Sequence, residues 1–183
     1  MQPARQDLPV TPGTTYRDTV RIMQPEFEYR PISSIAGAPV LLTVPAHGLA
    51  SDWPVWIRSV QGMPELNREP FKQLPHRAKR IDVDVLEINS LSATGLKPEG
   101  GQLVYRLPVD LVGASVSMAV HRGAEPVVQI ALGTGLAIAA PGTVTRMLTP
   151  AQTLLLSGEG LTYSFDVTFP DGTITRYFEG SIK

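Results

Sequence analysis

The chain contains no cysteine among its 183 residues. Disulfide bonds, thiolate metal sites and cysteine nucleophiles are therefore excluded. No apolar run approaches the roughly 18 residues that a membrane-spanning helix needs, so no membrane segment is expected. The 16 basic and 17 acidic side chains nearly cancel, so no overall attraction to nucleic acid is expected. Residues 1–7 lack the apolar core of a secretion signal, which predicts synthesis in a cytoplasm.

Helical periodicity is also nearly absent. Instead, 16 glycines and 17 prolines favour short strands and tight turns, which predicts an all-β fold. The expected strands cover residues 14–23, 35–44, 53–60, 80–88, 102–107, 114–121, 126–132 and 137–148. One short helix is expected after Thr149, because Thr149-Pro150-Ala151-Gln152 combines an N-cap hydroxyl, a first-turn proline and the glutamine of a capping box.

A hairpin is predicted at the C-terminal end. Residues 161–169 alternate apolar and polar side chains, Pro170-Asp171-Gly172 makes a turn, and residues 173–179 return. A two-residue turn would pair Phe169 with Ile174, whereas a three-residue turn with a glycine bulge would set Asp166 opposite Arg176. Pro170 has no N–H to donate in the first arrangement, so the second is favoured.

The second half of the chain carries several short motifs of one known family. The motifs are Asp110-Leu111-X-Gly113-Ala114, Leu148-Thr149-Pro150-Ala151, Tyr163-Ser164-Phe165-Asp166-Val167, Pro170-Asp171-Gly172-Thr173, Arg176 and Glu179-Gly180. This pattern resembles the immunoglobulin-like domain at the N-terminus of phage baseplate upper proteins. In that family a strand similar to residues 13–18 precedes the Asp-Leu-X-Gly motif by a short hairpin. Here about ninety residues separate them.

The intervening segment has a resemblance of its own. Val44-Pro45-Ala46-His47-Gly48-Leu49 and the stretch from Val55 to Asn67 resemble a small β-barrel module of phage tail proteins, which is similar to the first catalytic-cysteine half-domain of ubiquitin-activating enzymes. The family usually has Gly-Asp before the second stretch, whereas this chain has Asp52-Trp53-Pro54. Without cysteine, ubiquitin-type chemistry is impossible.

The two resemblances together imply an immunoglobulin-like antiparallel β-sandwich with an inserted small β-barrel. The expected division is an N-terminal arm at 1–13 that orders only against a partner, the sandwich at 14–30 and 108–183, and the barrel at 31–107. An insertion whose own ends lie close together costs little loop-closure entropy.

The implied function is that of a structural virion protein of a tailed bacteriophage or phage-like particle. It would act in the tail, baseplate or fibre-attachment region, through contacts with other virion proteins in a symmetric, multi-copy assembly. A location in the tail of the particle is favoured over one in the head. Two alternatives stay open: a carbohydrate- or receptor-binding module, and a capsid decoration or head fibre.

Five residues are candidates for contact with a partner or a glycan: Trp53, Trp56, Arg77, Lys79 and Arg80. Aromatic rings near a strand start can stack on sugars, although such rings more often lie in a core or an interface. The basic run around Arg77 could meet phosphates or an acidic protein surface, and it lacks the interleaved aromatics typical of nucleic-acid binding.

The remaining chemical groups favour structural roles. His47 in Ala46-His47-Gly48 is interpreted as a turn residue whose imidazole bonds to the backbone. Asp82 and Asp84 alternate with apolar residues, which predicts the solvent side of a strand rather than a metal site. No catalytic, cofactor or metal constellation is recognised, so an enzyme is not expected.

Overall fold

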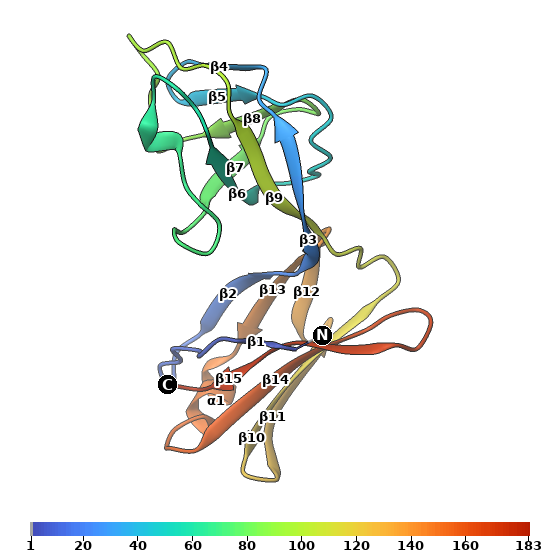
Figure 1. Ribbon diagram of the computed structural model, residues 1–183. Helices are drawn as coiled ribbons and strands as arrows, with labels where there is room; N and C mark the ends of the chain where they lie inside the picture. The colour runs from blue at the N-terminus through green and yellow to red at the C-terminus, as the bar shows by residue number, and fades with distance from the viewer. Residues whose placement is uncertain (1) are drawn as a thin grey trace. The chain divides into compact units, whose positions relative to one another are not determined.

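The computed structural model describes residues 2–183 and shows an all-β protein, as the sequence predicts (Figure 1). The chain forms two compact units. Unit 1 contains the residues up to Ile22 together with Val109–Lys183, and unit 2 contains Met23–Pro108. The backbone N–H of Val109 donates to the carbonyl of Ile22 at 3.0 Å, so the two ends of unit 1 that flank the insertion meet. The expected boundary at residue 30 therefore differs from the observed one at Ile22.

Unit 1 is built on one curled sheet with the order β1-β15-β14-β10-β11-β12-β13-β2. Its strands are β1 (Ala4–Arg5), β2 (Tyr16–Arg21), β10 (Ser115–Arg122), β11 (Glu125–Leu132), β12 (Gly135–Ala140), β13 (Thr143–Leu148), β14 (Leu161–Thr168) and β15 (Ile174–Ser181). The sheet folds over between β11 and β12, so its two halves enclose a common apolar core as in a sandwich.

Gly135 makes the turn between the two layers possible. β11 and β12 pair in parallel over only two residue pairs, and Gly135 has a φ of +99°. A Cβ atom there would lie 2.8 Å from the carbonyl oxygen of Met147 and 3.0 Å from the side chain of Ile130. Only glycine combines this backbone conformation with such a close approach.

The C-terminal hairpin has the three-residue turn. Phe169 and Thr173 close the turn, the N–H of Gly172 donates to the Phe169 carbonyl at 2.9 Å, and Asp166 lies opposite Arg176. A bulge between Phe165 and Asp166 then restores the pairing of Phe165 with Phe178. The predicted register is confirmed.

The predicted short helix is α1 (Pro150–Leu155), which connects β13 to β14. The hydroxyl of Thr149 accepts from the N–H of Gln152, and the Gln152 side chain accepts from the N–H of Thr149. The capping box is therefore confirmed.

The N-terminal arm is ordered against unit 1 of its own chain. The backbone N–H of Leu8 donates to the carbonyl of Ser181 at 2.9 Å, and the side chains of Leu8 and Val10 are buried in the core of unit 1. The expectation that residues 1–13 order only against another protein is corrected, because two apolar side chains in a polar segment are enough to anchor it.

Unit 2 is a second curled sheet with the order β3-β9-β6-β7-β8-β5-β4. Its elements are β3 (Met23–Pro31), β4 (Ser34–Ala36), β5 (Val40–Thr43), β6 (Trp53–Arg58), the 3₁₀ helix η1 (Pro64–Leu66), β7 (His76–Arg80), β8 (Val85–Ile88) and β9 (Gln102–Pro108). The sheet surrounds its own apolar core. β3 is the edge strand of this sheet and pairs with β9, so residues 23–30 belong to unit 2.

Three of the expected strands are each divided into two strands: residues 35–44 belong to β4 and β5, residues 80–88 to β7 and β8, and residues 137–148 to β12 and β13. Residues 80–88 were expected to be continuous, but residues 81–84 form a turn between β7 and β8. Ile81 and Val83 are exposed, and the N–H of Asp84 donates to the Asp82 carboxylate at 2.8 Å. Aspartate side chains that bond to the backbone two residues ahead favour turns, and this preference outweighs the alternation.

Within residues 2–183, no helix has both the length and the apolar character needed to cross a membrane.

Candidate functional site

The outer surface of the sheet in unit 2 carries a cluster of aromatic and arginine side chains. Along β6, Trp53, Val55 and Ile57 point into the core, so the alternate residues Trp56 and Arg58 point outward. Phe27 on β3 lies opposite Arg106 on β9. With Tyr29 and Phe71, these residues define the aromatic–arginine face: Phe27, Tyr29, Trp56, Arg58, Phe71 and Arg106.

The rings of this face form one connected group centred on Phe27. Its ring centroid lies 5.9 Å from that of Trp56, 5.5 Å from that of Phe71 and 6.5 Å from that of Tyr29. The first two contacts are edge-to-face, which is a preferred geometry for aromatic pairs and contributes about 0.5–1.5 kcal/mol per pair. Val104 lies between Tyr29 and Trp56 in the strand register, and it is fully buried although it points away from the core.

Both arginines of the face stack on its rings. The guanidinium carbon of Arg106 lies 4.4 Å from the centroid of Phe27 and 5.7 Å from that of Phe71. Arg58 lies 5.0 Å from the centroid of Tyr29 and donates two hydrogen bonds to the side-chain oxygen of Gln102. Stacking on a ring keeps a guanidinium in a fixed place while its edge stays available to an anionic group.

The loop after η1 presents two large apolar side chains to solvent. Phe71 is 85% exposed and Leu74 is 84% exposed. Phe71 also has a φ of +65°, a conformation that is costly for a residue with a side chain. A strained backbone that displays an exposed aromatic ring is typical of a functional contact.

This loop is held in place by hydrogen bonds. The indole N–H of Trp56 donates to the carbonyl of Gln73 at 2.8 Å, and Arg68 donates to the carbonyls of Leu74 and Pro75 at 3.1 and 3.2 Å. The exposed rings therefore sit on an ordered support. A preorganised surface of this kind loses less entropy on binding.

The structure separates the two predicted tryptophans. Trp53 is 1% exposed and donates its indole N–H to the carbonyl of Arg106 at 2.7 Å, so it is a core residue. The interpretation of Trp53 as a partner or glycan contact is corrected: the inward direction at the start of β6 buries it. Trp56 lies on the aromatic–arginine face.

The three predicted basic residues lie on β7, where Arg77 and Lys79 share the outward direction. Arg77 is opposite Pro54, which precedes Trp56 by two residues and shares its outward direction. Lys79 is exposed and lies 3.5 Å from the carboxylate of Glu87. Arg80 is exposed, and its backbone N–H donates to the carboxylate of Asp52 at 3.2 Å. Arg77 and Lys79 therefore extend the positive charge of the face.

Phe27, Tyr29, Arg58 and Arg106 are members of the face that the sequence did not predict. A signal was present, because residues 26–30 alternate in the order Glu-Phe-Glu-Tyr-Arg. The expected strand at residues 14–23 ended before this alternation, because Pro25 follows that strand. Pro25 is tolerated since the pairing of β3 with β9 is irregular between Met23 and Phe27.

The two buried histidines of unit 2 hold loops together. His47 Nδ1 accepts from the N–H of Leu49 at 3.0 Å, and Nε2 lies 3.0 Å from the carbonyl of Asp82, which confirms its interpretation as a turn residue. His76 Nε2 lies 2.8 Å from the carbonyl of Leu66. Burial lowers the pKa of both imidazoles.

The aspartates near His47 also support a loop. The carboxylate of Asp84 accepts from the N–H of Ala46 at 2.7 Å. Asp82 and Asp84 therefore belong to turns rather than to the wet face of a strand. Across residues 2–183, no three histidine, aspartate or glutamate side chains are grouped so that they could hold a metal ion.

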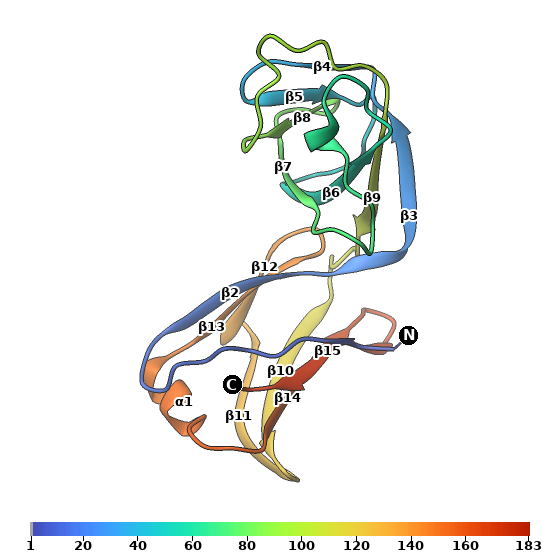
Figure 2. The ribbon, with the colours of Figure 1, turned by 60° about the vertical axis from the view of Figure 1, so that its left-hand side comes forward.

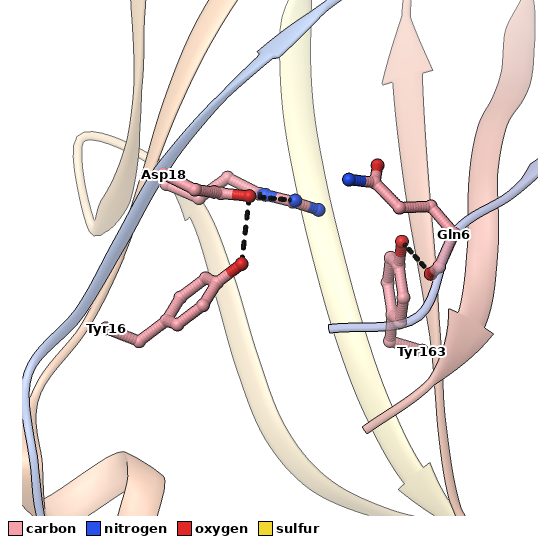
Figure 3. Close-up of polar contacts among 5 residues, drawn as sticks. Gln6, Tyr16, Asp18 and Tyr163 are labelled. Carbon is pink, nitrogen blue, oxygen red and sulfur yellow. Dashed lines mark hydrogen bonds and ion pairs between the residues drawn. The ribbon is translucent and has the colours of Figure 1, made fainter. Parts of the chain in front are cut away.

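Unit 1 contains a buried polar cluster between its layers (Figure 3). Arg146 on β13 has a fully buried side chain and forms an ion pair with Asp18 on β2, with its Nε 2.8 Å from the carboxylate. The hydroxyl of Tyr16 donates to Asp18 at 2.9 Å. Burial disfavours the charge of Arg146, but its bonds to Asp18 outweigh this and raise the guanidinium pKa. Burial and the Asp18 charge raise the pKa of Tyr16 to about 12.

Comparison with known proteins gives no match, since neither a family model, a curated protein nor a solved structure is significantly similar to this chain.

Proposed function

We propose that this chain is a structural subunit of a tailed bacteriophage or phage-like particle, in the tail, baseplate or fibre-attachment region, and that it acts through assembly contacts with other virion proteins. The observation that carries the role in assembly is the aromatic–arginine face of unit 2. Aromatic and arginine side chains are the residue types most enriched at the energetic centres of protein interfaces.

The character of the face defines the neighbour it fits. Phe71 and Tyr29 offer exposed rings, while Arg58, Arg106 and Arg77 supply positive charge around them. The complementary surface is apolar at its centre and acidic at its rim. In a symmetric particle, many copies of such a modest contact together give a stable assembly.

The assignment to phage particles rests on the motif resemblance. Two of its motifs have definite local structures: Pro170-Asp171-Gly172 forms the three-residue turn, and Thr149-Pro150 opens the capped helix α1. A further residue of the pattern, Arg176, pairs with Asp166 at 2.8 Å. These structures support the resemblance in unit 1, and a non-enzymatic role is part of the same proposal.

The test uses particles that carry the gene for this chain. Mass spectrometry of purified particles should find the chain in stoichiometric amount. The change Phe71→Ser should lower its incorporation at least tenfold, which corresponds to about 1.4 kcal/mol of contact energy. Ile174→Ser is the matched control, because Ile174 is an exposed apolar residue of unit 1. A chain that is absent from particles and remains a soluble monomer would contradict the proposal.

One observation favours a second candidate function, the binding of a glycan. The ring of Tyr29 is half exposed and lies beside Arg58 and Gln102, which can donate hydrogen bonds to sugar hydroxyls. A glycan array probed with the full chain tests this candidate. Binding that disappears in Tyr29→Ala would favour it, and an array without signal would dismiss it.

A further inference from the structure

The N-terminal segment, defined as residues 2–10, runs along the last strand of unit 1 (Figure 2). The edge of β15 and the core positions that this segment fills are together called the groove. The segment runs parallel to β15, with Ala4 opposite Phe178 and Arg5 opposite Glu179. Three backbone N–H groups of the segment, those of Gln6, Leu8 and Val10, donate to carbonyls of residues 179, 181 and 183 at 2.8–2.9 Å. The segment thus completes the edge of the sheet.

The groove also receives side chains. Leu8 is fully buried and Val10 is almost fully buried, and both belong to the apolar core of unit 1. The residue between them, Pro9, is exposed. The segment therefore binds as an added strand does, with main-chain hydrogen bonds for affinity and alternate side chains in apolar sites for specificity.

Several features of the groove fit this segment in particular. A Cβ atom at Gly180 would overlap the backbone oxygen of Gln6, so glycine is needed for the close approach. The hydroxyl of Tyr163 donates to the same oxygen at 2.7 Å (Figure 3). Asp7 accepts from the N–H of Ser181 at 3.1 Å and lies 2.5 Å from the amine of Lys183.

The connection between the segment and β2 is short and exposed. All five residues from 11 to 15 are exposed. The N–H and the hydroxyl of Thr14 both bond to the carbonyl of Thr11, and Gly13 has a φ of +78°. If this turn straightened, five residues would span up to about 17 Å. The segment then reaches away from its own unit, and the core sites of Leu8 and Val10 stay filled only if an identical segment takes its place.

We propose that the groove is a strand-acceptor site and that, in the assembled state, it receives the N-terminal segment of a second copy of this chain. The groove recognises residues 6–8 of this sequence, and an identical copy carries the same residues. Exchanged and unexchanged forms contain the same contacts between segment and groove, and they differ only in the connecting residues 11–15. High local concentration in a multi-copy assembly therefore favours exchange. The inference does not depend on the aromatic–arginine face.

The cysteine-free chain gives a clean background for the test. One full-length variant carries Arg5→Cys and a second, tagged variant carries Glu179→Cys, because these residues are register partners and both are exposed. The two variants are refolded together at increasing concentration and then oxidised. We expect a disulfide-linked heterodimer whose yield rises with concentration. Ile174→Cys in place of Glu179→Cys is the control, since Ile174 is exposed on the same strand but out of register, and it should give no heterodimer.

Two further variants make the outcome decisive. The double variant Arg5→Cys/Glu179→Cys should form covalent dimers or larger rings at high concentration and an intrachain disulfide at low concentration. Deletion of Pro12 and Gly13 should shift this change to at least tenfold lower concentration, because the shortened connection hinders the unexchanged form. A double variant that forms only the intrachain disulfide at every concentration, together with the absence of the heterodimer, would overturn the proposal.

Discussion

The charge of Asp18 is expected to matter far more to stability than that of Asp166, although both pair with an arginine on the neighbouring strand. Asp18 pairs with Arg146, whose side chain is 0% exposed, whereas Asp166 pairs with Arg176, whose side chain is 50% exposed. Both pairs place the arginine Nε 2.8 Å from the carboxylate. The two pairs therefore differ mainly in burial.

The change Asp18→Asn keeps the shape of the side chain and removes its charge. It leaves the guanidinium of Arg146 buried without a counter-ion, which typically costs about 3–5 kcal/mol. Asp166→Asn removes a solvent-exposed pair and should cost less than about 1 kcal/mol. For a urea slope near 2 kcal/mol per M, the first change lowers the unfolding midpoint of unit 1 by roughly 2 M.

The position of the tryptophans allows the two units to be followed separately. Trp53 and Trp56 are the only tryptophans of the chain and both lie in unit 2, so tryptophan fluorescence reports the unfolding of unit 2. Far-ultraviolet circular dichroism reports both units. Asp18→Asn should lower the dichroism transition of unit 1 and leave the fluorescence transition in place.

Two results would refute this reasoning. One is a cost of Asp18→Asn no larger than that of Asp166→Asn, which would mean that Arg146 finds water or another partner when Asp18 loses its charge. The other is an equal shift of the tryptophan transition. The double change Asp18→Leu/Arg146→Met should recover most of the loss, because an apolar pair of similar volume removes the stranded charge.

Three further outcomes are expected. Burial lowers the folded-state pKa of His47 and His76, so their contribution to the stability of unit 2 is complete above about pH 6.5. Below that pH the contribution is lost by up to about 1.4 kcal/mol per pH unit for each histidine. Urea midpoints from tryptophan fluorescence should therefore fall between pH 7.5 and 5, and a flat profile would contradict this. Thr149→Ala removes the hydroxyl of the capping box and should cost unit 1 about 1 kcal/mol by dichroism, while Thr149→Ser should restore most of it. In Gly135→Ala the added Cβ would lie 2.8 Å from the Met147 carbonyl oxygen at a residue of positive φ, so the thermal midpoint of unit 1 should fall by several degrees. The control is Gly133→Ala, where φ is also positive but the added Cβ meets no atom within 4 Å. This change should lower the midpoint less.

Local chemistry made part of the fold predictable. Pro170-Asp171-Gly172 specifies its three-residue turn because proline presets one φ and glycine accepts a positive one. Thr149 and Gln152 specify the start of α1 because each bonds to the backbone of the other. These features depend on neighbours in the chain, so the sequence contains the information that they need.

Features that depend on distant partners were not predictable in the same way. Residues 80–88 alternate like a strand, yet Asp84 bonds to Ala46, which is 38 residues away, and this contact helps to fix a turn. Trp53 and Trp56 look equivalent in the sequence, and the direction of β6 buries one and places the other on the surface. Phe27 and Arg106 meet only because β3 and β9 pair across about eighty residues.

The sequence by itself therefore determined that the protein is all-β, where its C-terminal hairpin turns and where its one α-helix among residues 2–183 begins. The tertiary structure decided which face of each strand is buried, that residues 23–30 join unit 2, and that the N-terminal segment lies on β15. The physical reason is that turns and caps are set by bonds over a few residues, whereas burial and strand pairing are set by contacts that only the folded chain brings together.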